Sequence, residues 1–328
     1  MFSLKEVRYL HIEFSTICNA RCPLCPRNLF GYPTNHGYEE TNFSLALAKK
    51  SFTPDFIKQL NHIHINGNFG DFVSNPESIE IVRFFREQNE QTRILISTNG
   101  SARSDEFWKE LASTGKITVA FCLDGLEDTH YLYRQDTNWK RILHNAKTFI
   151  SAGGLASWKM IKFDHNSHQI EDCKKLSKEL GFSNFELVDD GRDTGPVFDR
   201  KGNYSHSIGD WVGPTTIDEL IKMPSDQLGI FDRRRKITCK AKLRHGIYVS
   251  AEGKVYPCCW LGFSPDTFEH RYFSTNNKQI KEVMINNSLH EYDLETCIQW
   301  FKNVESSWDK KSYQSGLIKL CDVHCGHS

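Results

Sequence analysis

The chain has 328 residues, of which 39% are hydrophobic and 25% are charged, as is ordinary for a soluble globular protein. Lys and Arg together number 41, as do Asp and Glu, so the net charge gives no reason to expect nucleic acid or an anionic membrane as a partner. No stretch approaches the roughly 18 apolar residues of a membrane span, and the N-terminal segment lacks the apolar region of a signal peptide. We therefore expect a cytoplasmic protein, in which 11 cysteines indicate metal binding rather than disulfide bonds.

Strand and helix patterns alternate through the first two thirds of the chain. Six strands are predicted, at 9–15, 62–67, 93–98, 117–124, 157–163 and 184–190. The stretches between them carry helix signals, such as Ser104 at an N-cap and an apolar stripe that includes Ile142 and Phe149. Such alternation implies parallel strands joined by right-handed crossovers. Six units are too few for a closed eight-stranded barrel, so we predict a partial barrel or an open sheet with ligands at the C-terminal strand ends.

The pattern changes after the sixth predicted strand. Residues 191–235 are rich in Gly, Asp, Ser and Pro and indicate an irregular connection or active-site loop, with a short helix at 215–223. The stretch GIYVSAEGKVYPCCW (246–260) has two β-rich runs separated by AEG, which predicts a hairpin with Gly253 in its turn. The remainder is mostly polar. We therefore divide the chain into residues 1–190, the connection, and a smaller unit at 236–328.

Three cysteines lie within eight positions directly after the first predicted strand: Cys18, Cys22 and Cys25, in the stretch CNARCPLC. This position places them on a loop at the C-terminal end of the sheet, where such folds bind ligands. A zinc knuckle is the competing interpretation, but knuckles usually pair two CxxC elements, and the next cysteine is Cys122. Three thiolates suit three irons of a 4Fe–4S cluster and leave the fourth iron free. An open coordination position is typical of a catalytic site.

This CxxxCxxC loop resembles that of the radical S-adenosylmethionine (SAM) enzymes. The resemblance implies an α/β fold, a partial (β/α)6 TIM-like barrel, over residues 1–190. It implies that the free iron binds SAM, that an electron from the cluster cleaves SAM to methionine and a 5′-deoxyadenosyl radical, and that this radical takes a hydrogen atom from the substrate. An electron donor of flavodoxin or ferredoxin type is the implied partner. Leu24 departs from the family, which usually has an aromatic residue before the last cysteine.

Three further segments match landmarks of that family in their order along the chain. The stretch NGNFGDF stands where the family has a Gly-Gly-Glu-like motif for the SAM amino group, STNG where it binds the carboxylate and ribose, and LDGLEDTHYLYR after the fourth strand. The resemblance implies these SAM-binding residues: Gly67, Asn68, Gly70, Asp71, Ser97, Thr98, Asn99, Asp124, His130 and Arg134. Each segment alone is equally compatible with a turn, a surface histidine or an exposed ion pair, so the prediction depends on their shared order.

A second group of cysteines lies in the C-terminal part. Cys239 precedes the predicted hairpin and Cys258 ends it, which resembles the opening of a twitch domain, the shorter form of the SPASM extension that holds auxiliary clusters. The resemblance implies a small α+β domain with a second 4Fe–4S cluster on four cysteines: Cys239, Cys258, Cys321 and Cys325. Cys259 and Cys297 remain alternative ligands, although neighbours in a strand point opposite ways. A structural zinc on the same thiolates is the alternative occupant. Cys122 and Cys173 are interpreted as small core residues.

The sequence leaves the substrate open. The twitch form favours oxidation or rearrangement of a small polar molecule, with the auxiliary cluster as electron acceptor, whereas relatives with full SPASM domains mostly modify peptides. The first strand begins by about residue 9, which leaves no room for a leader-binding domain, so a peptide or protein is the alternative substrate. A non-catalytic zinc protein is the remote alternative. Candidate substrate contacts are the basic run at 232–236, Arg192, Arg200, His206 and Trp211, and candidate bases are Glu13, Lys159, Lys162, Asp189 and Asp190.

Overall fold

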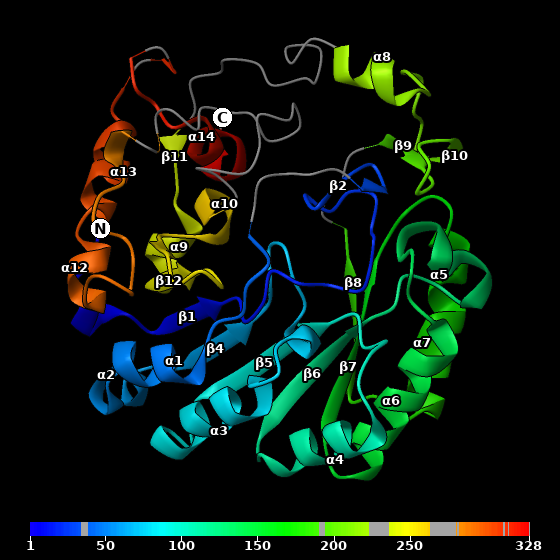
Figure 1. Cartoon of the computed structure of the whole chain (residues 1–328), viewed down its shortest axis with the longest axis horizontal. Coiled ribbons are helices and arrows are strands. Elements are labelled where there is room, and N and C mark those ends of the chain that lie inside the picture. The colour runs from blue at the N-terminus through cyan, green and yellow to red at the C-terminus, as the bar shows by residue number, and fades with distance from the viewer. Residues whose placement is uncertain are drawn as a thin grey trace.

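The computed structural model describes residues 1–33, 39–189, 194–222, 236–262, 280, 282–310, 312–313 and 315–327. Its centre is a sheet of eight strands in the order β13-β12-β1-β4-β5-β6-β7-β8 (Figure 1). The parallel strands are β12 (Gly246–Val249), β1 (Tyr9–Ile12), β4 (His62–Ile65), β5 (Arg93–Thr98), β6 (Ile117–Cys122), β7 (Leu155–Ile161) and β8 (Asn184–Val188). At one edge, β13 (Val255–Tyr256) pairs antiparallel with β12. The predicted α/β class with a mostly parallel sheet is confirmed.

The predicted hairpin is also present, and the structure shows where it joins the sheet, which the sequence did not predict. Strands β12 and β13 pair through Tyr248 with Tyr256 and Val249 with Val255, and Gly253 lies in the turn with a φ of +75°. In addition β12 pairs in parallel with β1, so that Tyr9 lies beside Gly246. The hairpin therefore extends the sheet beside its first strand, although the two are distant in sequence. The division into 1–190, 191–235 and 236–328 stays a prediction.

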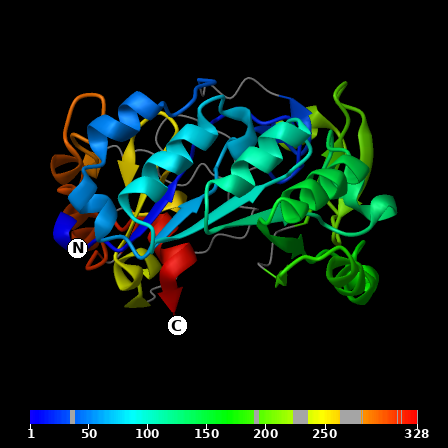
Figure 2. The same cartoon turned by 90° about the horizontal axis from the view of Figure 1, so that it is seen from below.

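Helices cover the outer side of the sheet (Figures 1 and 2). They are α1 (Leu45–Ser51), α2 (Pro54–Lys58), α3 (Ser78–Gln88), α4 (Asp105–Ser113), α5 (Glu127–Tyr133), α6 (Trp139–Ser151) and α7 (Ile170–Glu179). Local capping defines where several begin: the side chain of Ser44 accepts a hydrogen bond from Leu47 N, and that of Asn138 accepts one from Arg141 N. As predicted, α6 buries Ile142 and Phe149.

Strand alternation separates an apolar face from a polar one. Leu10 and Ile12 of β1 are buried in the hydrophobic core together with Ile63 and Ile65 of β4. The intervening residues, such as His11, point to the opposite face of the sheet. The inner face of these strands is therefore polar, and the loops at their C-terminal ends carry the predicted SAM segments.

The remaining described elements lie over the inner side and one end of the sheet (Figure 1). They comprise β2 (Asn28–Leu29), β3 (Tyr32–Pro33), β9 (Gly195–Phe198), β10 (Tyr204–Ile208), α8 (Ile217–Lys222), β11 (Lys236–Ile237), α9 (Lys240–Arg244), α10 (Cys259–Gly262), α12 (Leu294–Ile298), α13 (Phe301–Ser307), α14 (Lys319–Cys325) and β14 (Gly326–His327). Separate 3-10 turns lie at Leu4–Glu6, Phe72–Ser74 and Ser167–Gln169. The predicted short helix at 215–223 corresponds to α8. None of the described helices has the length and apolar character that crossing a membrane requires.

Candidate functional site

The three clustered cysteines lie on the loop that follows β1. Cys25 N donates to Cys22 O at 3.0 Å, and Arg27 Nη1 donates to Cys18 O at 2.9 Å, so these hydrogen bonds fix the loop. Burial, followed by the nearby Asp71, Cys22 and Cys25, raises the pKa of the Cys18 thiol above its ordinary range. Negative charge on Cys22 and Cys25 thus disfavours the Cys18 thiolate, and a bound cation would relieve that repulsion.

Two nitrogen donors face the sulfurs of this loop. Asn99 Nδ2 lies 3.6 Å from Cys18 Sγ, and Arg134 Nη1 lies 3.8 Å from Cys22 Sγ. N–H groups directed at ligand sulfurs stabilise negative charge on them and tune metal centres. In the described part of the chain, no three His, Cys, Asp or Glu side chains already have the mutual arrangement of a formed metal site. The thiols together with their donors nevertheless fit an iron–sulfur cluster chemically.

Asp71 joins two of the predicted SAM segments. Its Oδ1 accepts from Thr98 Oγ1 at 2.6 Å, and its Oδ2 accepts from Asn99 N at 2.7 Å and from Asn99 Nδ2 at 2.9 Å. Val73 N donates to Oδ1 as well, at 3.1 Å. Burial raises the pKa of Asp71, and these donors oppose the rise. The carboxylate is 7% exposed and has several donors, so in this structure it holds Asn99 toward the cysteine loop.

Glu13 fixes the glycine-containing loop 67–70. Its Oε1 accepts from Phe69 N at 2.7 Å and Gly70 N at 2.9 Å, and its Oε2 accepts from Tyr248 Oη on β12 at 2.8 Å. A Cβ on Gly70 would collide with Ser15 O, which explains the glycine at that position. Glu13 is completely buried, and in this structure it supports the loop, while its role as a candidate base stays a prediction.

Replacing Glu13 by glutamine should remove a pH dependence of stability. Burial raises the pKa of Glu13 from 4.5 to about 7, so between these values the folded chain binds a proton that the unfolded chain has released. Stability from this group is therefore present below pH 4.5 and lost as the pH rises through 7. Glutamine keeps the acceptor for the two amides. We expect the wild type to lose about 3 kcal/mol relative to Glu13→Gln between about pH 4.5 and 8, measured by urea unfolding at both values. An equal difference at both pH values would contradict this assignment.

The segment after β6 contains a buried ion pair. Asp124 Oδ2 lies 2.6 Å from Arg134 Nε, and Asp124 Oδ1 accepts from Ile161 N at 2.6 Å. His130 Nδ1 accepts from Asp124 N at 3.1 Å, and burial lowers the pKa of His130 to about 4, so the ring is neutral. Of the three predicted residues in this segment, Arg134 reaches the cysteine loop, whereas Asp124 and His130 hold the segment in place.

A chain of polar side chains along the inner face was not identified from the sequence. His64 Nε2 lies 3.1 Å from Ser97 Oγ, and its Nδ1 lies 3.1 Å from Tyr9 Oη, while His11 stacks on it with 5.1 Å between ring centres. Burial lowers the pKa of His64 well below its ordinary value, so it acts as a neutral hydrogen-bonding group. The alternating sequence HIHI (62–65) is the signal that could have located this polar chain, because period-two spacing places His62 and His64 on the same face of the sheet.

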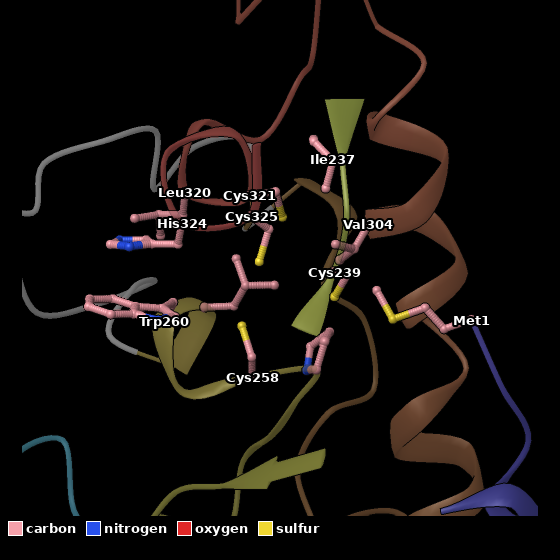
Figure 3. A pocket seen from close by; sticks show the side chains of 12 residues that line it. Met1, Ile237, Cys239, Cys258, Trp260, Val304, Leu320, Cys321, His324 and Cys325 are labelled. Carbon is pink, nitrogen blue, oxygen red and sulfur yellow. The ribbon is translucent and has the colours of Figure 1, made fainter. Parts of the chain in front are cut away.

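The four C-terminal cysteines line a single cavity, as Figure 3 shows: Cys239, Cys258, Cys321 and Cys325. Cys239 and Cys325 lie close enough to interact, and donation by the Cys239 thiol lowers the pKa of Cys325 and raises that of Cys239. Cys321 and Cys325 are four residues apart on α14, so their side chains lie on one helix face. This geometry explains the CxxxC spacing of the final pair.

The two alternative ligands lie elsewhere. Cys258 lines the cavity, whereas Cys259 lies near Glu13. Burial is the main cause that raises the pKa of Cys259, and the charge of Glu13 raises it further. Cys297 is buried on α12, where burial and the neighbouring Asp293 and Glu291 raise its pKa to about 12. Neither is among the residues that line the cavity.

Most other candidate polar residues are engaged within the protein. Lys159 of β7 lies 3.5 Å from Glu186 of β8, and Lys162, directly after β7, lies 3.0 Å from Asp189, directly after β8. Arg200 pairs with Asp136 at 2.8 Å, His206 Nε2 lies 3.0 Å from Leu132 O, and Trp211 lies against Phe30. Asp190, Arg192 and residues 232–235 lie outside the described residues.

Comparison with known proteins supports the fold. No protein-family model matches the chain. A curated relative, the "Tungsten-containing aldehyde ferredoxin oxidoreductase cofactor-modifying protein" of Pyrococcus furiosus, is 29% identical over 121 residues, which cover 37% of this chain and 32% of the relative. The match thus spans about a third of that protein's length.

Solved structures resemble almost the whole chain. Streptococcus suis SuiB bound to S-adenosylmethionine aligns with a TM-score of 0.56 and 15% identity over 97% of this chain and 73% of SuiB. The protein anSMEcpe with bound AdoMet (S-adenosylmethionine) aligns with a TM-score of 0.56 and 17% identity, over 97% of this chain and 88% of anSMEcpe. SuiB bound to the precursor peptide SuiA aligns with a TM-score of 0.53 and 14% identity, over 97% of this chain and 72% of SuiB. The chain therefore has the fold of these S-adenosylmethionine-bound structures.

Proposed function

We propose that the chain is a radical SAM enzyme that abstracts a hydrogen atom from its substrate. The observation that carries this proposal is the placement of Asn99 and Arg134, whose nitrogens face two sulfurs of the three-cysteine loop after β1. When bound, the 4Fe–4S cluster supplies the electron that cleaves SAM to methionine and a 5′-deoxyadenosyl radical. The fold shared with the S-adenosylmethionine-bound SuiB structure supports the same proposal.

In this proposal the chain's own residues bind and position SAM. Cys18, Cys22 and Cys25 would hold the cluster, and the loop 67–70, which Glu13 fixes, would bind the SAM amino group. Asp71 holds Asn99 and Thr98, which would bind the SAM carboxylate and ribose. The SAM pocket comprises Gly67, Asn68, Gly70, Asp71, Ser97, Thr98, Asn99, Asp124, His130 and Arg134, with Asp124 and His130 in a supporting position.

An auxiliary 4Fe–4S cluster in a twitch-like unit is the second part of the proposal. The support is that four cysteines line one cavity, which is the number of thiolates that a fully ligated 4Fe–4S cluster requires (Figure 3). A closed cluster suits electron transfer, since binding a substrate there would require the loss of a ligand. A structural zinc would use the same four thiols.

The reaction that fits both parts is oxidation or rearrangement of a small polar molecule, with an electron donor of flavodoxin or ferredoxin type for the first cluster. A peptide or protein is the alternative substrate. The structure of SuiB bound to a precursor peptide, which has the same fold, is consistent with this alternative.

Anaerobic reconstitution with iron and sulfide tests the proposal. We expect about eight irons per chain, the sum of two 4Fe–4S clusters, and 5′-deoxyadenosine after addition of reductant and SAM. Candidate substrates are then supplied in deuterated form, and mass spectrometry of 5′-deoxyadenosine identifies the substrate and the carbon attacked. Two tightly held zinc ions and no cleavage of SAM would refute the proposed function.

A further inference from the structure

One side chain connects the two proposed cofactor sites directly. Asn68 lies on the loop 67–70, is 8% exposed, and donates from Nδ2 to Cys259 O at 2.9 Å. Cys259 begins α10 and follows Cys258, which lines the four-cysteine cavity. A loop proposed to bind SAM is therefore hydrogen-bonded to the backbone beside a proposed auxiliary ligand, 191 residues away in sequence.

Close packing reinforces this connection. A Cβ on Gly262, at the end of α10, would collide with the Tyr248 ring and would lie 3.4 Å from Asn68 Nδ2. Tyr248 in turn donates to Glu13, whose other oxygen accepts from Phe69 N and Gly70 N. Helix α10, Tyr248 and the loop 67–70 thus form one packed unit, in which a displacement of any part requires a displacement of the others.

We propose that Asn68 is a positioning residue that couples occupation of the four-cysteine site to SAM binding. This inference rests on the proposed function. A metal centre bound by the four thiols would fix Cys258 and the start of α10, and the hydrogen bond from the Asn68 amide to Cys259 O would transmit that restraint to the loop 67–70. Because linkage is reciprocal, SAM binding to the loop favours the arrangement of α10 that the filled site requires.

A double-mutant cycle on SAM affinity tests the coupling. The dissociation constant is measured by anaerobic equilibrium dialysis with labelled SAM and without reductant, so that SAM is not cleaved. Cys325→Ser, which removes one ligand of the four-cysteine site, should weaken SAM binding about five-fold in the wild-type background, the effect of losing one hydrogen bond. In the Asn68→Leu background, the same substitution should have no further effect. Asn68→Gln, which keeps a donor amide, should restore the response to Cys325→Ser.

Asn145→Leu is the matched control. Asn145 is a buried amide that donates to Gly100 O at 2.7 Å and Ala102 O at 3.1 Å, so it supports the STNG segment from a helix other than α10. It should weaken SAM binding, yet Cys325→Ser should still weaken binding by the same factor in its background. An equal effect of Cys325→Ser in the wild-type and Asn68→Leu backgrounds, or no effect in the wild type, would overturn the coupling.

A second measurement covers the case in which Cys325→Ser does not fold. Hydrogen exchange of the reconstituted full chain should show faster exchange in both 67–70 and 258–262 in Asn68→Leu, whereas Asn145→Leu should affect only the segment around 97–102. Unchanged exchange at 258–262 in Asn68→Leu would also overturn the inference. Failure of the proposed function is distinct, because the wild type would then bind no SAM in the dialysis.

Discussion

Replacing Cys22 by serine should abolish formation of 5′-deoxyadenosine and lower the reconstituted iron from about eight to about four per chain. Cys22 is 8% exposed, lies on the loop after β1 and has Arg134 Nη1 near its sulfur. Serine oxygen is a poor substitute for a thiolate at an iron–sulfur cluster. The measurements are iron and sulfide analysis, the cluster absorption band, and chromatography of the SAM products after anaerobic reduction.

Cys173→Ala is the control for this experiment. Cys173 is buried on α7 within the hydrophobic core, and burial raises the pKa of its thiol to about 12. Its loss should leave both iron content and SAM cleavage unchanged. Full activity of Cys22→Ser, or an equal loss of iron in both variants, would contradict the assignment of the three-cysteine loop as the SAM-cleaving site.

Replacing Asp124 by asparagine should destabilise the chain by about 3 kcal/mol or more. The Asp124 side chain is completely buried and pairs with Arg134 at 2.6 Å, and the Arg134 side chain is 15% exposed. Asparagine keeps an acceptor for Ile161 N but leaves the guanidinium without its charge partner in a poorly solvated position. Urea unfolding of the metal-free chain measures the effect on the free energy of unfolding.

An exposed ion pair provides the comparison. Arg83 and Glu110 are 2.8 Å apart, with side chains 39% and 46% exposed, so Glu110→Gln should change the free energy of unfolding by less than about 1 kcal/mol. Similar effects of Asp124→Asn and Glu110→Gln would show that the buried pair is not a structural support of the segment after β6. Asp124→Asn should also weaken SAM binding, because Arg134 loses the contact that directs it toward Cys22.

The strands could be predicted because their signal is local. The segments 93–98 and 117–124 have the β-branched and apolar composition of buried strands, and β5 and β6 form there. The pairing of β12 with β1 could not be predicted in this way. No short pattern specifies which distant strand a hairpin will join, since that choice depends on the exposed edge that the rest of the sheet leaves.

The candidate ligands show the same distinction. The CxxxCxxC loop is contiguous, so its spacing alone predicts Cys18, Cys22 and Cys25 as cluster ligands. The four C-terminal cysteines are far apart in the sequence, so only the resemblance groups them. Helix α14 places the last two together, because residues four apart in a helix share a face, and Cys321 and Cys325 both line the cavity.

By itself the sequence determined the element order, the α/β class and the residue types available to the site. Only the tertiary structure decided what each polar residue does. The sequence offers Glu13 as a candidate base and Asp71 as a candidate SAM ligand, and the structure adds that Glu13 accepts from two loop amides and Tyr248, and Asp71 from Thr98 and Asn99. The physical reason is that the role of a buried carboxylate depends on which donors surround it, and those donors come from strands and loops that only the folded chain brings together.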